Sequence, residues 1–188
     1  MQITLLIRCS YRPDGFAKTF ASIPSDVKIV CSYDDERALS YIPEHIQKVR
    51  VYKSDLPWFY DAYCNDLKEL VTDGYFAFLD EGDIILPGSL DALRLTLKGS
   101  HGVICQFSRG GKLKPPMPYI FNRQIVRGKI GMPCLFLHHS HKNVADLDGS
   151  VGAADYHWIK AVARKIKLKF VNIPVVYADK RDGGATEG

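Results

Sequence analysis

Cysteines are few in this chain, and their spacing indicates neither a cross-link nor a metal site. The five thiols are odd in number and widely spread, and no CxxC pair occurs among Cys9, Cys31, Cys64, Cys105 and Cys134. A disulfide framework or a thiolate zinc site needs paired cysteines at characteristic spacings. We therefore expect five buried free thiols.

Low-complexity segments and long apolar runs are also missing. With 15 Gly, 10 Pro, 46% hydrophobic and 24% charged residues, the composition excludes collagen-like and disordered chains. The longest apolar stretches, such as Ile3–Ile7, fall far short of the roughly 20 residues that cross a bilayer. We expect no membrane span and, because the first residues lack the pattern of an export signal, a cytoplasmic location.

Neither sign of charge dominates the chain. It carries 25 Lys and Arg against 21 Asp and Glu, for a net charge of +4. This small and scattered excess is compatible with an anionic ligand but does not indicate nucleic acid, so we expect no nucleic-acid partner. At 188 residues the chain has the length of a single domain with one core.

Short β-branched runs alternate with helical patterns through the first hundred residues. Their order predicts an α/β fold with a mostly parallel central sheet and helices on both faces. A strand, an apolar run, a polar loop, a helix and a last strand follow. We expect strands over 3–7, 27–31, 49–52, 75–79, 103–107 and 170–177, helices over 16–23, 36–42, 58–71, 89–97 and 153–166, and a mobile tail over 179–188.

Polar residues follow three of the expected parallel strands. They lie over 8–13, 32–36 and 80–83, and parallel strands place all three at one edge of the sheet, where ligands of open α/β sheets bind. No G-x-G-x-x-G turn follows the first strand, and no G-x-x-x-x-G-K-[ST] loop occurs anywhere. A dinucleotide site or a P-loop is therefore disfavoured.

The acidic turn after the fourth strand is a candidate cation site. Asp80 and Asp83 follow a very apolar strand, and Gly82 allows a tight turn between them. Carboxylates hold hard divalent cations, so Mn²⁺ or Mg²⁺ here would in turn hold phosphates. The alternative is a solvated turn before a helix, although the apolar residues of 84–86 favour acids held on a packed scaffold.

Two residues outside that turn are further candidates. His139, in a His-rich loop with His138 and His141, would complete a metal shell or hydrogen-bond a phosphate or acceptor. Alternatively, these are loop histidines with unrelated partners. Arg181, next to tail glycines, would fold over a diphosphate, or else belongs to a solvated terminus.

The run over 75–90 resembles the aspartate-rich metal motif of GT-A-fold glycosyltransferases of the family-two type, in which an apolar strand enters a DxD-like cluster. The opening over 3–13 is similar to their first strand and nucleotide-contacting loop. Asp34 and Asp35 stand where that family carries base-contacting acids, and Asn65 matches a common Asn. The sequence departs from the pattern at Gly82, where the family has an acid, and at Arg8, where it usually has proline.

The resemblance covers roughly residues 3–97 and implies a single GT-A-like domain over 1–188, with a nucleotide-binding half over about 1–100 and an acceptor half over about 101–178. It implies a metal-dependent transfer, with inversion, from a nucleoside diphosphate sugar to a hydroxyl of a glycan or other acceptor. Donor-binding residues would be Arg8, Tyr11, Arg12, Asp34, Asp35, Asn65 and Arg181, and metal ligands Asp80, Asp83 and His139.

Asp155 is the expected general base. The segment over 153–156 resembles the start of the family's late helix, whose carboxylate takes the acceptor proton. An acid in a first helical turn is also favoured simply by the helix dipole.

Two other functions remain open at this point. One is nucleotidyl transfer on a related scaffold, although the residues of 11–15 match its glycine- and lysine-rich loop poorly. The other is a catalytically degenerate carbohydrate- or nucleotide-binding domain, which Gly82 and the missing acid before Asp155 favour.

Overall fold

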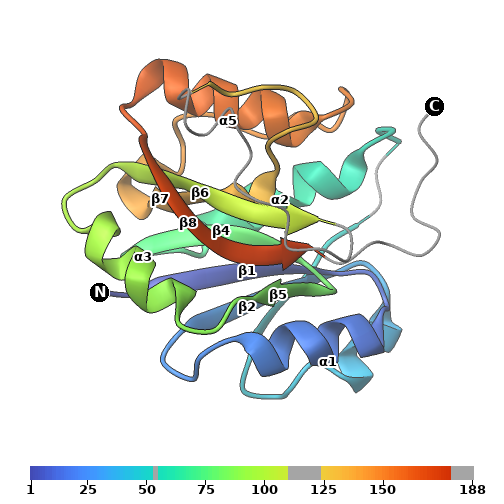
Figure 1. Ribbon diagram of the computed structural model, residues 1–188. Coiled ribbons are helices and arrows are strands. Elements are labelled where there is room, and N and C mark those ends of the chain that lie inside the picture. Colours follow the sequence, from blue (N-terminus) through green and yellow to red (C-terminus); the bar gives the residue numbers. More distant parts are fainter. Residues whose placement is uncertain (53–54, 110–123, 179–188) are drawn as a thin grey trace.

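A computed structural model describes residues 1–52, 55–109 and 124–178 (Figure 1). The strands are β1 (Ile3–Cys9), β2 (Lys28–Tyr33), β3 (Gln47–Arg50), β4 (Tyr75–Asp80), β5 (Asp83–Ile85), β6 (Gly102–Arg109), β7 (Leu135–His138) and β8 (Lys169–Ala178). The α-helices are α1 (Pro13–Ser22), α2 (Phe59–Glu69), α3 (Ser89–Leu97) and α5 (Ala154–Lys165). Three short 3-10 helices join them, namely η1 (Glu36–Ser40), η2 (Met132–Cys134) and η3 (His139–His141).

The described strands form one eight-stranded sheet in the order β3-β2-β1-β4-β7-β6-β8-β5. Strand β1 pairs in parallel with β2 and β4, and β2 pairs in parallel with β3. Strand β7 runs antiparallel to both β4 and β6, while β6 and β8 are parallel. The expected α/β fold with a mostly parallel sheet is confirmed, with β7 and β5 as the strands that run the other way.

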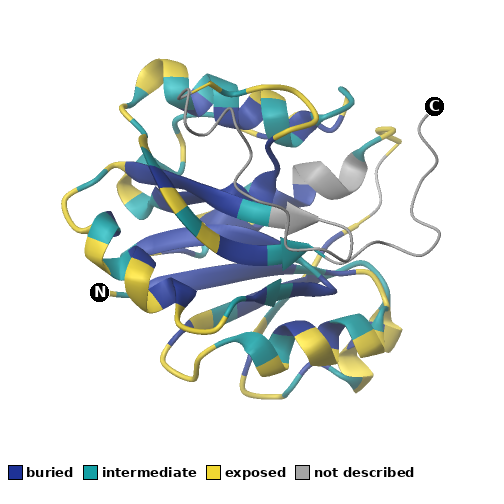
Figure 2. Ribbon diagram, in the orientation of Figure 1, coloured by how far each residue is buried: buried dark blue, intermediate teal, exposed yellow. Residues whose placement is uncertain are grey.

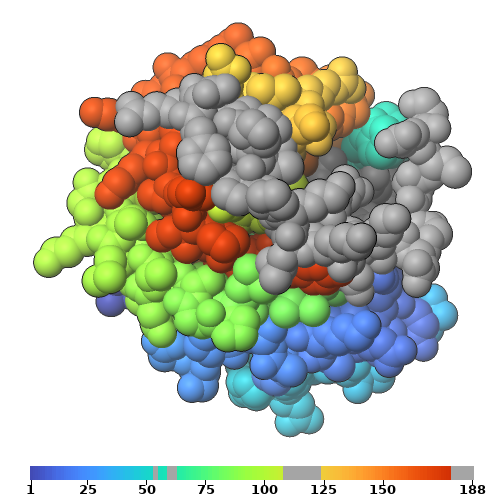
Figure 3. All heavy atoms as spheres, viewed as in Figure 1, coloured from blue at the N-terminus to red at the C-terminus, as the bar shows by residue number. Residues whose placement is uncertain are grey.

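Helices cover both faces of the sheet. The core on one face joins β1 side chains such as Leu5 to α1 and α3, and the core on the other joins Leu6 to α2 and α5. Successive residues of β1 thus point into opposite cores, so the strand needs a continuous apolar run. Figure 2 shows the strands largely buried between the helix layers, and Figure 3 shows β8, in red, reaching the surface beside the α3 segment.

Two elements differ from the sequence-based expectations. The expected helix over 36–42 is the shorter η1. Asp35 caps its start, because the Asp35 carboxylate accepts a hydrogen bond from the Arg37 N–H at 2.9 Å. Strand β5 was not expected, because the acidic turn before it reads as a loop. Its three residues pair antiparallel with the distant β8, with Ile84 opposite Tyr177. Only this long-range pairing makes the segment a strand.

The direction of β7 decides at which edge of the sheet the loop after it lies. We call the edge at the carboxyl ends of β1, β2 and β4 the carboxyl edge, and the opposite one the amino edge. Because β7 is antiparallel to β4, with His138 opposite Tyr75, the residues after β7 lie at the amino edge. The loop over 138–152 therefore begins far from the acidic turn.

Within the described residues, the cysteines are as the sequence predicts. All five cysteines are buried and free. No helix within these residues is long and apolar enough to span a membrane.

The turn before β4 provides a test of the sheet's packing. Gly74 has φ +65°, and an added Cβ would lie 2.2 Å from the Gln2 carbonyl oxygen, whereas Gly99 has φ +72° with nothing within 4 Å. Gly99→Ala should lower the free energy of unfolding by about 1 kcal/mol through backbone strain alone. Gly74→Ala adds a clash with backbone and should cost about 3 kcal/mol. Urea unfolding followed by circular dichroism measures both, and equal losses would contradict the clash.

Candidate functional site

The carboxyl edge brings together the β1–α1 loop and the acidic turn after β4. Arg8 and Asp80 are register partners on neighbouring strands. The Arg8 Nε donates a hydrogen bond to Asp80 Oδ1 at 2.8 Å, and its Nη2 donates to the same oxygen. The expectation that these loops share one edge is confirmed, and an ion pair joins them.

Glu81 ties the two loops together, although sequence reasoning did not single it out. Its side chain is only 3% exposed, and its Oε2 accepts hydrogen bonds from the backbone N–H groups of Ser10 at 2.8 Å and Arg12 at 3.2 Å. Its Oε1 accepts from the Tyr41 hydroxyl, and its carbonyl accepts from Arg12 Nη1 at 2.9 Å. An acid between two expected ligands reads as exposed, so the sequence carried no sign of this role.

Tyr11 lies between Ser10 and Arg12, the two residues whose backbone N–H groups donate hydrogen bonds to Glu81. Its backbone has φ +61°, in the left-handed region that side chains other than glycine rarely adopt. Consecutive N–H groups around such a residue converge on an anion, and here that anion is Glu81. Tyr11 as a residue is 40% exposed, and the Arg37 guanidinium lies 4.1 Å from the centroid of its ring. The loop therefore presents an aromatic surface at the carboxyl edge.

Two protonated side chains, the half-buried Tyr41 and the buried Cys9, lie beside Glu81. Burial, together with the hydrogen bond to Glu81 and its charge, raises the pKa of Tyr41, so the phenol stays a donor at neutral pH. A hydrogen bond with Cys31 and burial raise the pKa of the Cys9 thiol, to which Glu81 adds its charge. These groups favour one arrangement of the network, with Glu81 as the acceptor.

The start of α1 packs directly on the acidic turn. The Gly82 N–H donates to Thr19 Oγ1 at 2.9 Å, and an added Cβ on Gly15 would lie 3.2 Å from the Gly82 nitrogen. This close approach holds the turn and the helix at a fixed distance.

The acids after β2 have different surroundings. Asp35 caps η1 and receives the Arg37 Nε at 3.0 Å on both carboxylate oxygens. Asp34 is half-buried, and its charge adds to burial in raising the pKa of Tyr63 to about 12. Asp34 thus lies at the edge beside Tyr63, while Asp35 is engaged in shaping η1.

Asn65 and Lys68 on α2 hold the loop that precedes α5. The Asn65 amide donates to the Leu147 carbonyl and accepts from the Leu147 N–H, each at 2.9 Å. The buried Lys68 Nζ donates to the Ala145 carbonyl at 3.0 Å and pairs with Asp146. These contacts give Asn65 an anchoring position in the fold, and its expected donor contact stays a prediction.

Asp155 lies in the first turn of α5. Its Oδ1 accepts from the Tyr156 N–H at 2.7 Å. Burial raises the pKa of the Cys134 thiol to about 12, and the charges of Asp155 and Asp83 both add to this. Since both carboxylates act on one thiol of η2, the structure brings Asp155 and Asp83 into the same region.

The described residues do not fit the expected cation site. The Asp80 carboxylate is paired with Arg8, and the Oδ2 of the buried Asp83 accepts the Asp80 N–H at 2.9 Å. Within residues 1–52, 55–109 and 124–178, no group of three or more His, Cys, Asp or Glu side chains is placed to hold a metal ion. Arg181, the expected phosphate ligand of the tail, lies outside the described residues.

The placement of His139 corrects one expectation. Its Nδ1 lies 3.3 Å from the Gly74 carbonyl oxygen, at the amino edge. Asp80 is at the other end of β4, about 16 Å along a strand that rises roughly 3.3 Å per residue. His139 therefore cannot share an ion with Asp80 and Asp83. The expectation assumed that the loop after residue 137 faces the acidic turn, and the antiparallel β7 reverses it.

Histidines gather at the amino edge instead. His141 Nε2 lies 2.8 Å from His101 Nδ1, and the rings of His138 and His139 are 4.5 Å apart. Burial lowers the pKa of His138 and of His141, and neighbouring histidine charges lower both further.

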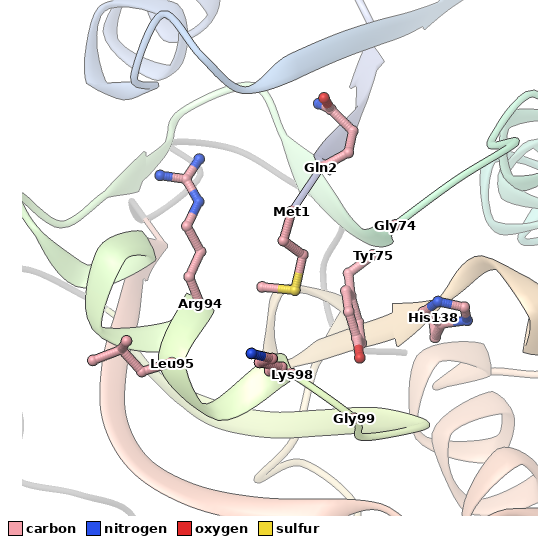
Figure 4. A pocket seen from close by; sticks show the side chains of 9 residues that line it. All are labelled: Met1, Gln2, Gly74, Tyr75, Arg94, Leu95, Lys98, Gly99 and His138. Atoms are coloured by element: carbon pink, nitrogen blue, oxygen red, sulfur yellow. The ribbon is translucent and has the colours of Figure 1, made fainter.

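A cavity of about 690 Å³ also opens at the amino edge (Figure 4). None of its lining residues is a donor-binding, metal-binding or catalytic candidate of the sequence analysis. The lining consists of Met1, Gln2, Gly74, Tyr75, Arg94, Leu95, Lys98, Gly99 and His138. The candidates Arg8, Asp34 and Asp80 lie at the other edge of the sheet, at the carboxyl ends of β1, β2 and β4.

Comparisons with known proteins agree on the fold. No protein-family model matches the chain, and no curated protein matches it. The crystal structure of S. aureus TarS 1-349 in complex with UDP-GlcNAc matches all of this chain with a TM-score of 0.75 at 13% identity. The same protein in complex with UDP matches 96% of it, with a TM-score of 0.69 at 13% identity. The bifunctional IspDF from Campylobacter jejuni matches 92%, with a TM-score of 0.56 at 12% identity.

This chain spans only part of these proteins, covering 62% and 61% of the two TarS 1-349 chains and 50% of the IspDF chain. At such low identity the likeness concerns the fold alone. The expected GT-A-like fold is confirmed.

The network around Glu81 yields the first prediction for this site. Glu81→Gln leaves an amide NH₂ facing protein donors and removes the charge that they stabilise. It should lower the free energy of unfolding by about 2 to 3 kcal/mol. Glu69→Gln, at an exposed glutamate 3.3 Å from the Lys142 ammonium, should change it by less than about 0.5 kcal/mol. Urea unfolding of both variants checks this, and a matching small loss for Glu81→Gln would contradict the network.

The histidines of the amino edge predict a pH dependence of stability. Because the folded state lowers the pKa of His138 and His141, the unfolded chain binds more protons near pH 6.5. Stability should therefore fall as the pH drops from about 7.5 to about 5.5. His141→Gln should reduce that fall, by less than about 1 kcal/mol since the ring is partly exposed. His45→Gln, outside the cluster, is the control, and urea unfolding at both pH values is the measurement.

Proposed function

We propose that this chain binds a nucleoside diphosphate sugar at the carboxyl edge and transfers the sugar to a hydroxyl of a glycan or other acceptor. The observation that carries the proposal is the convergence of the β1–α1 loop and the acidic turn, joined through Glu81 and the Arg8–Asp80 pair. It occurs on a fold that matches TarS in complex with UDP-GlcNAc over the whole chain.

Each part of the donor would meet a different group at this edge. The exposed Tyr11 ring offers a stacking surface for a nucleobase, because a base and a phenol ring both bury flat apolar faces. The half-buried Asp34 would accept hydrogen bonds from the nucleoside. Arg8 and Arg12 offer guanidinium groups, which pair with phosphate oxygens in a forked geometry.

The transfer itself would proceed with inversion, with Asp155 as general base. The acceptor oxygen attacks the anomeric carbon while Asp155 takes the hydroxyl proton. The bond from that carbon to the diphosphate oxygen breaks, and the electron pair leaves with the nucleoside diphosphate. Negative charge therefore grows on the diphosphate, and guanidinium groups held at fixed positions stabilise it. The Mn²⁺ or Mg²⁺ that the resemblance implies enters none of these steps.

The proposal is tested by binding and turnover. Thermal shift with UDP, GDP and their sugar derivatives should raise the melting temperature for at least one of them, since a ligand of the folded state stabilises it. Release of nucleoside diphosphate in the presence of acceptor glycans then measures transfer. Binding without transfer would support the degenerate binding domain, and no shift by any nucleotide would overturn the proposal.

The role of Asp155 is a separate prediction. Asp155→Asn retains the size of the side chain but lacks a basic oxygen, so the transfer rate should fall about 100-fold or more. Donor affinity, measured by titration calorimetry, should remain within about threefold. Asp91→Asn, at an exposed acid paired with Arg94 on α3, should leave both unchanged. Full activity of Asp155→Asn would remove this residue from the mechanism.

A further inference from the structure

The Arg8–Asp80 ion pair lies where the sequence analysis expected a divalent cation. We infer that the Arg8 guanidinium itself supplies the positive charge that holds the donor's diphosphate, so that donor binding needs no divalent cation. This inference rests on the proposed function, and it concerns how the same edge neutralises its ligand.

The distribution of exposed charge at the acidic turn supports this. Glu81 and Asp83 are 3% and 6% exposed, and each accepts hydrogen bonds from backbone N–H groups. The side chains of Arg8 and Asp80 are 14% and 26% exposed, and Arg12 is half-buried. At this turn the guanidinium groups of Arg8 and Arg12 therefore reach solvent beside the Asp80 carboxylate, where they can meet the oxygens of an approaching diphosphate.

The pairing of Asp80 works against a second cation. Both the Nε and the Nη2 of Arg8 donate to the same oxygen, Asp80 Oδ1. A divalent ion on this carboxylate would have to lie beside a guanidinium of like charge or displace it. His139, which the sequence analysis placed in the ion's shell, lies at the amino edge. The acids that would recruit a cation thus have other partners.

The position of Arg8 suits a fixed phosphate ligand. It lies in β1, so its backbone is held between two neighbouring strands, β2 and β4. The guanidinium stays charged across the whole physiological pH range and forms forked hydrogen bonds with phosphate oxygens. Because the Arg8 guanidinium is part of the protein, its charge is present without prior binding of a metal ion.

Titration calorimetry with UDP and GDP tests the inference on the intact chain, in EDTA and in Mn²⁺. We expect dissociation constants in the two buffers to agree within about threefold. Arg8→Gln should weaken binding in EDTA about 10-fold or more, the loss of one charge-assisted hydrogen-bonding group. Arg8→Lys retains a point charge without the forked donors, so its nucleotide affinity should lie between those of the unmodified chain and Arg8→Gln.

Arg8→Gln also removes the guanidinium that pairs with the Asp80 carboxylate, so Mn²⁺ should restore part of the affinity of this variant while leaving that of the unmodified chain unchanged. Arg94→Gln is the matched control, since Arg94 is an equally ion-paired arginine, bonded to Asp26 and Asp91 away from the carboxyl edge. It should bind nucleotide like the unmodified chain. Circular dichroism confirms that each variant is folded, and Arg8→Lys keeps the test open if Arg8→Gln does not fold.

The outcomes separate this inference from the proposed function. Binding that appears only with Mn²⁺, or that Arg8→Gln and Arg8→Lys leave unchanged in EDTA, overturns the inference and leaves the proposed function standing. Absence of binding by either nucleotide in both buffers overturns the two together.

Discussion

The carboxylate of Glu81 is the constraint on which the carboxyl edge depends. A buried acid is stable only where donors surround it, and here the Ser10 and Arg12 N–H groups and the Tyr41 hydroxyl do so. Because these donors come from the β1–α1 loop and from the end of η1, one side chain fixes three segments that are distant in sequence. The exposed ring of Tyr11 and the Arg8–Asp80 pair owe their positions to that arrangement.

The direction of β7 separates the histidine cluster from the polar loops of the carboxyl edge. Parallel β1, β2 and β4 bring their polar ends to one edge, whereas the antiparallel β7 carries the histidine loop to the other. The chain then returns, and Asn65 and Lys68 on α2 hold its path until α5 begins. Asp155 thus reaches the region of Asp83, although the loop before it starts at the opposite edge.

The acids of the turn have different surroundings from those that their residue types suggest. The sequence of the turn predicts a cluster of exposed carboxylates that needs a cation. In the structure, two of these acids are buried and accept hydrogen bonds from the protein itself. The third is paired with the guanidinium of the neighbouring strand. This arrangement lies on a fold that matches TarS in complex with UDP-GlcNAc.

The sequence by itself determined the α/β class, the parallel core of the sheet, helices on both faces and the edge where polar loops meet. These follow from apolar periodicity and from the handedness of crossovers, which act locally along the chain. Tertiary structure alone decided that β5 is a strand, that His139 lies far from Asp80, and that Glu81 is a buried acceptor. Each depends on which distant segment pairs with which, and a residue's type does not reveal its partner across the sheet.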